Sequence, residues 1–178
     1  MKKSDIQNQV LIMCGISGSG KTHYALQCEE NGYIRLSIDA IIWGKVGAGL
    51  FSLSKEEQKR LFTECRMEVR SLFIELLKSG RKVVVDATHC SRSSRDDIRN
   101  ICAKLEVKPV FVYCYAEKEE LWRRLSKRKG TGPDDLIVSR EELSGYWRSF
   151  ERPQEDESDF VFFNKSGQNP PYSYGSNL

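Results

Sequence analysis

The chain has 178 residues, of which 39% are hydrophobic and 30% are charged, and its formal net charge at pH 7 is only +3. This length and composition fit one soluble globular domain with a real core, and the small charge permits a nucleic-acid partner without arguing for one. No apolar run reaches the roughly 18 residues of a membrane span, and the start MKKSDIQNQV lacks the apolar stretch of a signal peptide.

The first third of the chain predicts two strands separated by a helix. VLIMC, residues 10–14, is apolar throughout and is followed by glycines, which is typical of a buried strand. A helix is expected from about residue 20 to residue 30. YIRLSID, residues 33–39, alternates and ends in an acid, so we expect a second strand there. KVGAGLFS, residues 45–52, is expected to be a glycine-bearing loop.

The clearest local prediction is a long helix that begins after Ser54. Ser54 with Glu57 forms a capping box, and apolar residues recur at helical spacing over 61–77. Gly80 then suits the end of the helix. The remaining elements follow in order: a strand in 81–88, a helix over about 93–105, a strand over 107–115, helices over 117–129 and 139–150, and a last strand over 159–164.

Strands that alternate with helices predict an α/β domain with a mostly parallel sheet, here of five strands, within residues 1–165. Residues 166–178 are rich in Gly, Pro, Ser and Asn without periodicity, so we expect a flexible C-terminal tail.

The cysteines favour a reducing compartment. No C-x-x-C pair occurs, and several cysteines lie within apolar patterns, where a free thiol acts as a small hydrophobe. We therefore expect reduced thiols in a cytoplasmic protein rather than a disulfide or zinc framework. The six residues are Cys14, Cys28, Cys65, Cys90, Cys102 and Cys114.

Residues 15–22, GISGSGKT, match the phosphate-loop pattern G-x-x-x-x-G-K-[ST] between a predicted strand and a predicted helix. Small residues let successive backbone N–H groups surround an anion, and the helix that begins there adds its positive end. Lys21 supplies a charge for the β- and γ-phosphates, and the Thr22 hydroxyl can ligate Mg²⁺. The expected nucleotide-binding residues of the loop are Gly15, Ser17, Gly18, Ser19, Gly20, Lys21 and Thr22.

Two carboxylates are expected beside this loop. Asp39 closes the second predicted strand and Asp86 closes the third. Ligands of an open parallel sheet bind beyond the carboxyl ends of its strands, so both side chains are well placed for catalysis. The alternative for each is an ordinary helix cap or turn residue.

A basic segment is the candidate lid. Arg124 and Arg128 are four residues apart in LWRRLSKRKG, so they are expected to share one helix face, and Gly130 and Gly132 follow. Such a segment suits a lid that closes arginines over a transferring phosphate, although a basic run is also typical of a solvated helix face.

GISGSGKT, LSID, VVVDAT and LWRRLSKRKG, in this order and spacing, resemble the P-loop kinases grouped with the 5′-kinase domain of phage polynucleotide kinase. That group includes zeta-toxin-like and chloramphenicol-phosphotransferase-like small-molecule kinases. The resemblance covers roughly residues 10–163. It implies a three-layer α/β/α fold like that of adenylate kinase with a helical lid, ATP with Mg²⁺ as cofactors, and phosphoryl transfer to a hydroxyl group.

The resemblance also implies roles for individual residues. Asp39 resembles the general base, and Asp86 resembles the acid that organises the acceptor or the metal. Arg124 and Arg128 resemble the nucleotide-contacting and phosphate-clamping arginines. Lys21, Asp39 and Arg128 are thus the expected catalytic residues.

One position departs from the polynucleotide kinase, where an arginine three residues after the catalytic aspartate grips the substrate phosphate. Here Ile42 occupies that position, within the apolar run that includes Trp43. Such a wall suits a partly apolar small molecule at least as well as a nucleic-acid end. His89, Arg92 and Arg95 are candidates to hold an anionic acceptor, although a solvated helix start is slightly favoured for them. The tryptophans Trp43, Trp122 and Trp147 are candidate stacking platforms, with a core or pocket-wall role favoured.

Three classes of function remain open at this point, in descending order of support. They are a small-molecule or metabolite kinase, a polynucleotide 5′-hydroxyl kinase, and a nucleotide-binding ATPase or switch. The sequence leaves open the acceptor, the oligomeric state and the choice between ATP and GTP.

Overall fold

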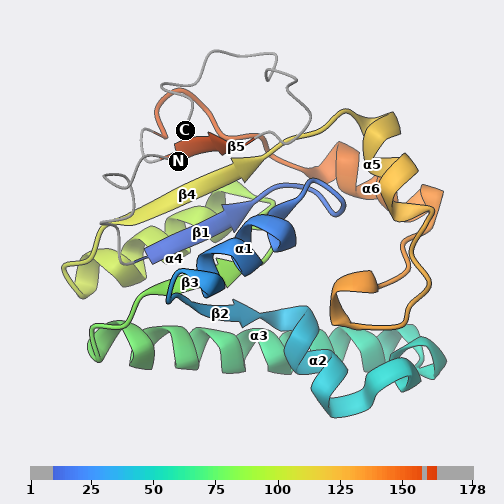
Figure 1. Ribbon diagram of the computed structural model, residues 1–178, viewed down its shortest axis with the longest axis horizontal. Coiled ribbons are helices and arrows are strands. Elements are labelled where there is room, and N and C mark those ends of the chain that lie inside the picture. Colours follow the sequence, from blue (N-terminus) through green and yellow to red (C-terminus); the bar gives the residue numbers. More distant parts are fainter. Residues whose placement is uncertain (1–9, 158–159, 164–178) are drawn as a thin grey trace.

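The computed structural model describes residues 10–157 and 160–163, and its centre is a five-stranded sheet in which all neighbouring strands are parallel. The strand order is β2-β3-β1-β4-β5 (Figure 1). The predicted α/β fold with a parallel sheet is therefore confirmed. The strands are β1 (Val10–Cys14), β2 (Ile34–Ser37), β3 (Val83–Asp86), β4 (Pro109–Cys114) and β5 (Phe160–Phe163).

Helices cover both faces of the sheet, which is typical of parallel sheets because the connections between their strands contain helices. On one face, α3 and α4 bury Val69, Phe73 and Ile101 against strand residues such as Ile12 and Val85. The helices are α1 (Lys21–Glu30), α2 (Ile38–Val46), α3 (Lys55–Lys78), α4 (Arg92–Lys104), α5 (Lys118–Leu125) and α6 (Arg140–Ser149), with the short 3₁₀ helices η1 (Gly47–Ser52) and η2 (Pro133–Asp135).

The opposite face of the sheet is covered by α1, which lies directly after β1. Tyr24 and Ala25 of α1 pack against Met13, Val84 and Val112 of the strands. The arrowheads of the strands point to the same edge of the molecule in Figure 1, where the loop before α1, the start of α2, and α5 with α6 gather. This edge is the carboxyl end of the sheet, which is where ligands bind in such folds.

The caps of α3 form as predicted. The Ser54 Oγ accepts a hydrogen bond from the Glu57 N–H at 3.2 Å, and a Glu57 carboxylate oxygen accepts one from the Ser54 N–H at 2.8 Å. At the other end Gly80 has φ +68°, and the Arg81 N–H donates to the Leu76 carbonyl. This is a Schellman ending, for which glycine is the favoured residue because it adopts positive φ without strain.

The segment after β2 differs from the prediction. The strand ends at Ser37, and Asp39 lies in the first turn of α2 rather than at the end of a strand. The reason is a helix cap, because the Ser37 Oγ accepts a hydrogen bond from the Ala40 N–H at 3.2 Å. The expected loop over 45–52 is also wrong, since α2 continues to Val46 and η1 follows.

The predicted helix over 117–129 is too long. Helix α5 ends at Leu125, and the chain turns so that the Arg128 N–H donates to the Leu125 carbonyl at 3.0 Å. Leu121 and Leu125 are buried, but no apolar residue follows at the next helical positions to hold a further turn against the core. Residues 126–139, which join α5 to α6, are called the lid segment below.

All six cysteines lie within the described residues; none is bonded to another, and five are buried. No helix in these residues is long and apolar enough to cross a membrane. The expected flexible tail, residues 166–178, lies outside the described residues.

Candidate active site

The loop between β1 and α1 has the backbone of an anion cradle. Gly15, Gly18 and Gly20 have φ values of +143°, +84° and +107°, which strain any residue with a side chain. A Cβ at Gly15 would also lie 2.3 Å from the Cys114 carbonyl oxygen. Since α1 begins at Lys21, the positive end of the helix faces the loop. These features fit a bound phosphate group.

Lys21 is nearly buried, with 8% of the residue exposed, and its Nζ donates to the Ile16 carbonyl at 3.0 Å. Burial lowers the pKa of its ammonium group, and the carboxylates of Asp86 and Asp39 act in the opposite direction. A cation held in such a dry position gains much from an anionic partner, because charges interact strongly where water is excluded. The surroundings of Lys21 therefore fit the phosphates of a nucleotide.

Asp39 and Asp86 come together at this sheet edge, as their positions in the sequence suggested. Asp86 ends β3 and is 8% exposed, whereas Asp39 is solvent-exposed at the start of α2. Partial desolvation and the nearby carboxylate of Asp86 raise the pKa of Asp39, and the charges of Lys21 and Arg128 oppose that rise. Asp39 therefore shares one electrostatic environment with the phosphate loop and the lid segment.

The two lid arginines have different surroundings. Arg124 donates from Nη1 to the Gly18 carbonyl at 3.0 Å and from Nε to Glu120 at 2.7 Å, so it touches the phosphate loop directly. Arg128 lies beyond the end of α5 and donates to the Leu136 carbonyl at 3.1 Å. The expectation that both share one helix face is therefore wrong, although Arg128 still lies near enough to act on Asp39.

Sequence reasoning missed Arg35, which contacts both Asp86 and the lid segment. Its Nε and Nη2 donate to Asp86 Oδ2 at 3.0 and 2.7 Å, and its Nη2 donates to Asp134 Oδ1 at 2.5 Å. The available signal was an arginine inside a strand expected to be covered on both faces. Such a cation needs a buried partner.

Of the three candidates for an anionic acceptor after Asp86, two are bound in other ion pairs and the third is uncharged. Arg95 is 0% exposed and paired with Glu157 at 2.7 Å, so a solvated helix start is wrong for it. Arg92 is paired with Asp156 on the surface. The Nε2 atom of His89 is buried without a partner, and burial lowers the pKa of this ring to about 4. A ring that is neutral at physiological pH supplies no charge to an anion.

Two of the candidate aromatic platforms belong to packed clusters. Trp122 and Trp147 pack beside the buried residues Leu121 and Leu143. Trp43 lies half-buried on α2, and its contact with an acceptor stays a prediction.

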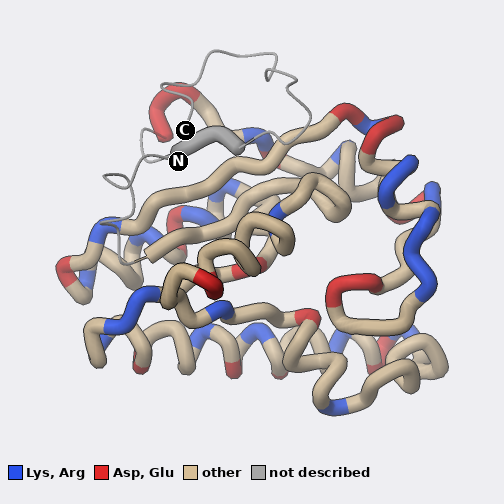
Figure 2. Tube along the Cα trace, in the orientation of Figure 1, with Lys and Arg blue, Asp and Glu red and all other residues tan. Residues whose placement is uncertain are grey.

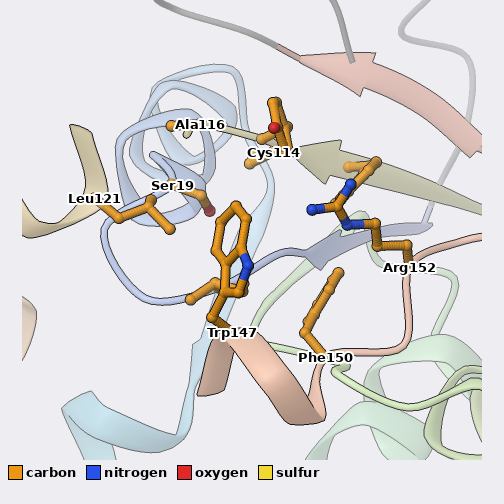
Figure 3. A pocket seen from close by; sticks show the side chains of 10 residues that line it. Ser19, Cys114, Ala116, Leu121, Trp147, Phe150 and Arg152 are labelled. Atoms are coloured by element: carbon orange, nitrogen blue, oxygen red, sulfur yellow. The ribbon is translucent and has the colours of Figure 1, made fainter. Parts of the chain in front are cut away.

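A small pocket lies beside the phosphate loop, next to Trp147. Figure 3 shows Trp147, Phe150 and Arg152 facing Ser19 and Leu121 across it. Ser19 is 3% exposed and lines this pocket, and its Oγ is a buried polar atom without a hydrogen-bond partner.

Charged residues of the site divide by sign into a basic side, Lys21, Arg124 and Arg128, and an acidic side, Asp39, Asp86 and Asp134. The two sides interact, because the carboxylates of Asp86 and Asp39 raise the pKa of Lys21 against the effect of burial. Figure 2 shows the same division along the lid segment, which is rich in Lys and Arg after α5 and acidic at η2. On the acidic side Asp86 is paired with Arg35, and position 42 is an isoleucine rather than an arginine.

Comparison with known proteins gives a family and a fold. The sequence model of the AAA domain family matches residues 10–153. Among curated proteins, no sequence matches the chain.

Solved structures of similar fold include kinases of small molecules and part of a nucleic-acid repair complex. A gluconokinase from Sinorhizobium meliloti 1021 is 21% identical with a TM-score of 0.61, over 89% of this chain and 83% of that one. A sugar kinase from a Janibacter species is 20% identical with a TM-score of 0.60, over 88% and 85%. A chain of the Pnkp1/Rnl/Hen1 RNA repair complex is 23% identical with a TM-score of 0.63, over 84% of this chain but 46% of that one. At these identities the likeness shows a shared fold, which confirms the expected resemblance to P-loop kinases.

Proposed function

The chain belongs to this family of AAA domains, and from its site we propose that it is an ATP-dependent kinase that phosphorylates a hydroxyl group of a small molecule. The observation that carries the proposal is the surroundings of the Asp39 carboxylate. This carboxylate stands in the same electrostatic environment as Lys21 and Arg128, and its pKa is raised by partial desolvation and by Asp86. A carboxylate with these neighbours suits proton removal beside a phosphate, which a simple nucleotide-binding protein does not need.

Nucleotide binding would use the basic side. The backbone N–H groups of residues 15–22 and the start of α1 would surround the phosphates, with Lys21 beside the β- and γ-phosphates. The Thr22 hydroxyl is the candidate ligand for Mg²⁺, an ion that neutralises charge on the transferring phosphate when it is bound. Arg124 already touches Gly18 of this loop at 3.0 Å, and Arg128 would approach from the lid segment.

Phosphoryl transfer would then use Asp39 as the base. An acceptor hydroxyl loses its proton as its oxygen attacks the γ-phosphate, and the Asp39 carboxylate would accept that proton. Its raised pKa makes it a stronger base than an ordinary aspartate. The closed lid segment would keep the charge of Arg128 beside the transferring phosphate.

The charges of the acidic side favour a small molecule without a phosphate next to its reacting hydroxyl. Ile42, three residues after Asp39, is 0% exposed and offers no cation. Arg35 is the nearest guanidinium to Asp86, but it is bound by Asp86 and Asp134. A nucleic-acid end needs a basic groove for its backbone, and the carboxylates here would repel one.

The test is a transfer assay with radiolabelled ATP against nucleosides, sugars, antibiotics of the hydroxyl-bearing classes and a 5′-hydroxyl oligonucleotide. We expect label on at least one uncharged or cationic small molecule and little on the oligonucleotide. Preferential labelling of the oligonucleotide would replace the small-molecule proposal by an end-phosphorylating kinase. Release of labelled phosphate with no labelled product across the panel, unaffected by Asp39→Asn, would favour an ATPase or switch and overturn the kinase proposal.

A further inference from the structure

Arg35 and Asp86 are fixed to each other by the sheet. Strands β2 and β3 pair in parallel with Arg35 opposite Val84 and Ser37 opposite Asp86. Residues opposite each other point to the same face, as do residues two apart along a strand, so both side chains lie on the face that α1 covers. Two donors of the Arg35 guanidinium converge on Asp86 Oδ2, at 3.0 and 2.7 Å.

The same guanidinium reaches the lid segment. Its Nη2 donates to Asp134 Oδ1 at 2.5 Å and its Nη1 donates to Asp134 Oδ2 at 3.4 Å. The side chains of Arg35 and Asp86 are 10% and 4% exposed, whereas that of Asp134 is 36% exposed. One end of this network is therefore built into the sheet, and the other end belongs to the more exposed lid segment.

Asp134 is carried by a loop that is tied together by its neighbour. The Asp135 carboxylate accepts hydrogen bonds from the Lys129 N–H at 3.0 Å and from the N–H and hydroxyl of Thr131 at 3.2 and 3.1 Å. The Gly130 N–H donates to the Asp135 carbonyl. Residues 129–135 therefore form one unit, and the place where Asp134 docks also determines where the adjacent Arg128 stands.

We propose that Arg35 is a positioning residue that binds Asp86 and Asp134 together and thereby sets the closed position of the lid segment, with Arg128 beside Asp39. The inference rests on the proposed function, because the roles of Arg128 and Asp39 are assigned there. In this arrangement Arg35 touches neither ATP nor acceptor. It acts through Asp134 on the lid segment and through Asp86 on the sheet edge.

The network also accounts for an arginine in a covered strand. Asp86 at 4% side-chain exposure needs a cation nearby, and Arg35 satisfies it from the neighbouring strand. The planar guanidinium has enough donors for two carboxylates at once, whereas the ammonium of lysine is a single point of charge. The Asp134 contact is partly exposed, so water can take its place when the lid segment opens, while the pair in the sheet stays formed.

The first test measures docking of the lid segment by limited trypsin digestion in the full chain, because Lys127 and Lys129 are exposed cleavage sites in that segment. We expect Asp134→Asn and Arg35→Gln each to raise the initial rate of lid cleavage by about three- to tenfold. The double variant should cleave no faster than the faster single variant, because both changes break the same contact. Cleavage sites are assigned by mass spectrometry.

The matched controls are Asp97→Asn and Arg70→Gln. Arg70 of α3 and Asp97 of α4 form an ion pair of the same residue types, in which Nη1 and Nη2 of Arg70 both donate to the Asp97 carboxylate. These variants remove the same charges far from the lid segment and should leave lid cleavage unchanged. If Arg35→Gln fails to fold, Arg35→Lys keeps the charge and should show an intermediate rate.

The second test separates positioning from stability. Binding of MgATP is measured by calorimetry, and the slow hydrolysis of MgATP, with water as acceptor, is measured per folded molecule. We expect the affinity to stay within about twofold in Asp134→Asn while hydrolysis falls about three- to tenfold, and the effect should vanish in the Arg35→Gln background.

Additive losses, or unchanged cleavage and hydrolysis in Asp134→Asn, would overturn the proposal. So would a lower melting temperature with a normal rate per folded molecule, because that pattern marks a purely structural pair. The cleavage test needs no acceptor, so its failure is distinguishable from failure of the proposed kinase function.

Discussion

The basic side and the acidic side of the site differ in what they can do to a phosphate. The basic side, Lys21 with Arg124 and Arg128, is built to neutralise an anion and includes contacts with the phosphate loop itself. The acidic side, Asp39 with Asp86 and Asp134, would repel an anion but can take up a proton. Under the proposed function, binding of nucleotide and transfer of its phosphate depend on different residues. Substitutions on the basic side should therefore change mainly the affinity for MgATP, and those on the acidic side should change mainly the rate of phosphoryl transfer.

The largest expected effect is on the acidic side. Asp39→Asn keeps the size of the side chain but removes the basic oxygen, so phosphoryl transfer should fall by at least about a hundredfold. MgATP affinity and the melting temperature should stay near normal. The measurements are transfer rates with an acceptor found by the labelled-ATP assay, calorimetry and thermal unfolding, with Asp97→Asn as the control. If the variant unfolds while the folded fraction transfers normally, Asp39 is a structural turn residue.

On the basic side, Lys21→Ala should lower MgATP affinity on the order of a hundredfold, because a nearly buried ammonium group is lost from the phosphates. Titration calorimetry measures the change, and Lys104→Ala, at the exposed end of α4, is the control. Unchanged affinity in a folded Lys21→Ala protein would contradict the assignment of the phosphate loop and would remove the basis of the two-sided comparison.

Arg128 belongs to the basic side but acts on Asp39 of the acidic side, so its substitution should affect transfer more than binding. Arg128→Gln should slow transfer by about ten- to a hundredfold with a smaller change in MgATP affinity, because its charge is needed most as phosphate is transferred. Arg148→Gln, on the exposed surface of α6, is the control. A structure with ATP analogue and acceptor in which Arg128 lies more than about 8 Å from every phosphate would exclude this role.

The smallest expected effect is a shift in pH dependence. Asp39 must be ionised to accept a proton, so transfer should decrease as pH falls through its raised pKa. The charges of Asp86 and Asp134 both raise that pKa, and those of Lys21 and Arg128 lower it. Arg128→Gln removes one of the lowering charges, so the acidic limb of the pH–rate profile should move to higher pH. A limb that stays fixed or moves to lower pH would contradict this coupling.

The parts of the fold that depend on local chemistry were predictable from the sequence. The capping box of Ser54 and Glu57, the glycine ending at Gly80 and the strand Val83–Asp86 each depend on a few adjacent residues, and all three form. The phosphate loop was equally predictable from the sequence, because its glycines, Lys21 and the following helix are contiguous.

The parts that were missed depend on choices between local alternatives or on distant partners. The alternation of apolar and polar residues in LSID fits a strand, whereas its serine fits the start of a helix. In the structure the Ser37 Oγ accepts a hydrogen bond from the Ala40 N–H, and the helix forms. Arg35 meets Asp86 and Asp134 across 51 and 99 positions of sequence. No local pattern contains such a contact, so the network of Arg35 with Asp86 and Asp134 became visible only in the folded chain.

Strand β5 has a consequence for biosynthesis. Strand β5 covers the edge of β4, and Glu157, just before it, is bound to the fully buried Arg95 of α4. A nascent chain emerges from its N-terminal end, so the β4 edge is open while the preceding sheet collapses. At that stage Arg95 has the carbonyls of His89 and Glu151 available but lacks the carboxylate of Glu157. Until residues through 163 have left the ribosome, the growing chain presents an open strand edge of the kind that chaperones shield from aggregation.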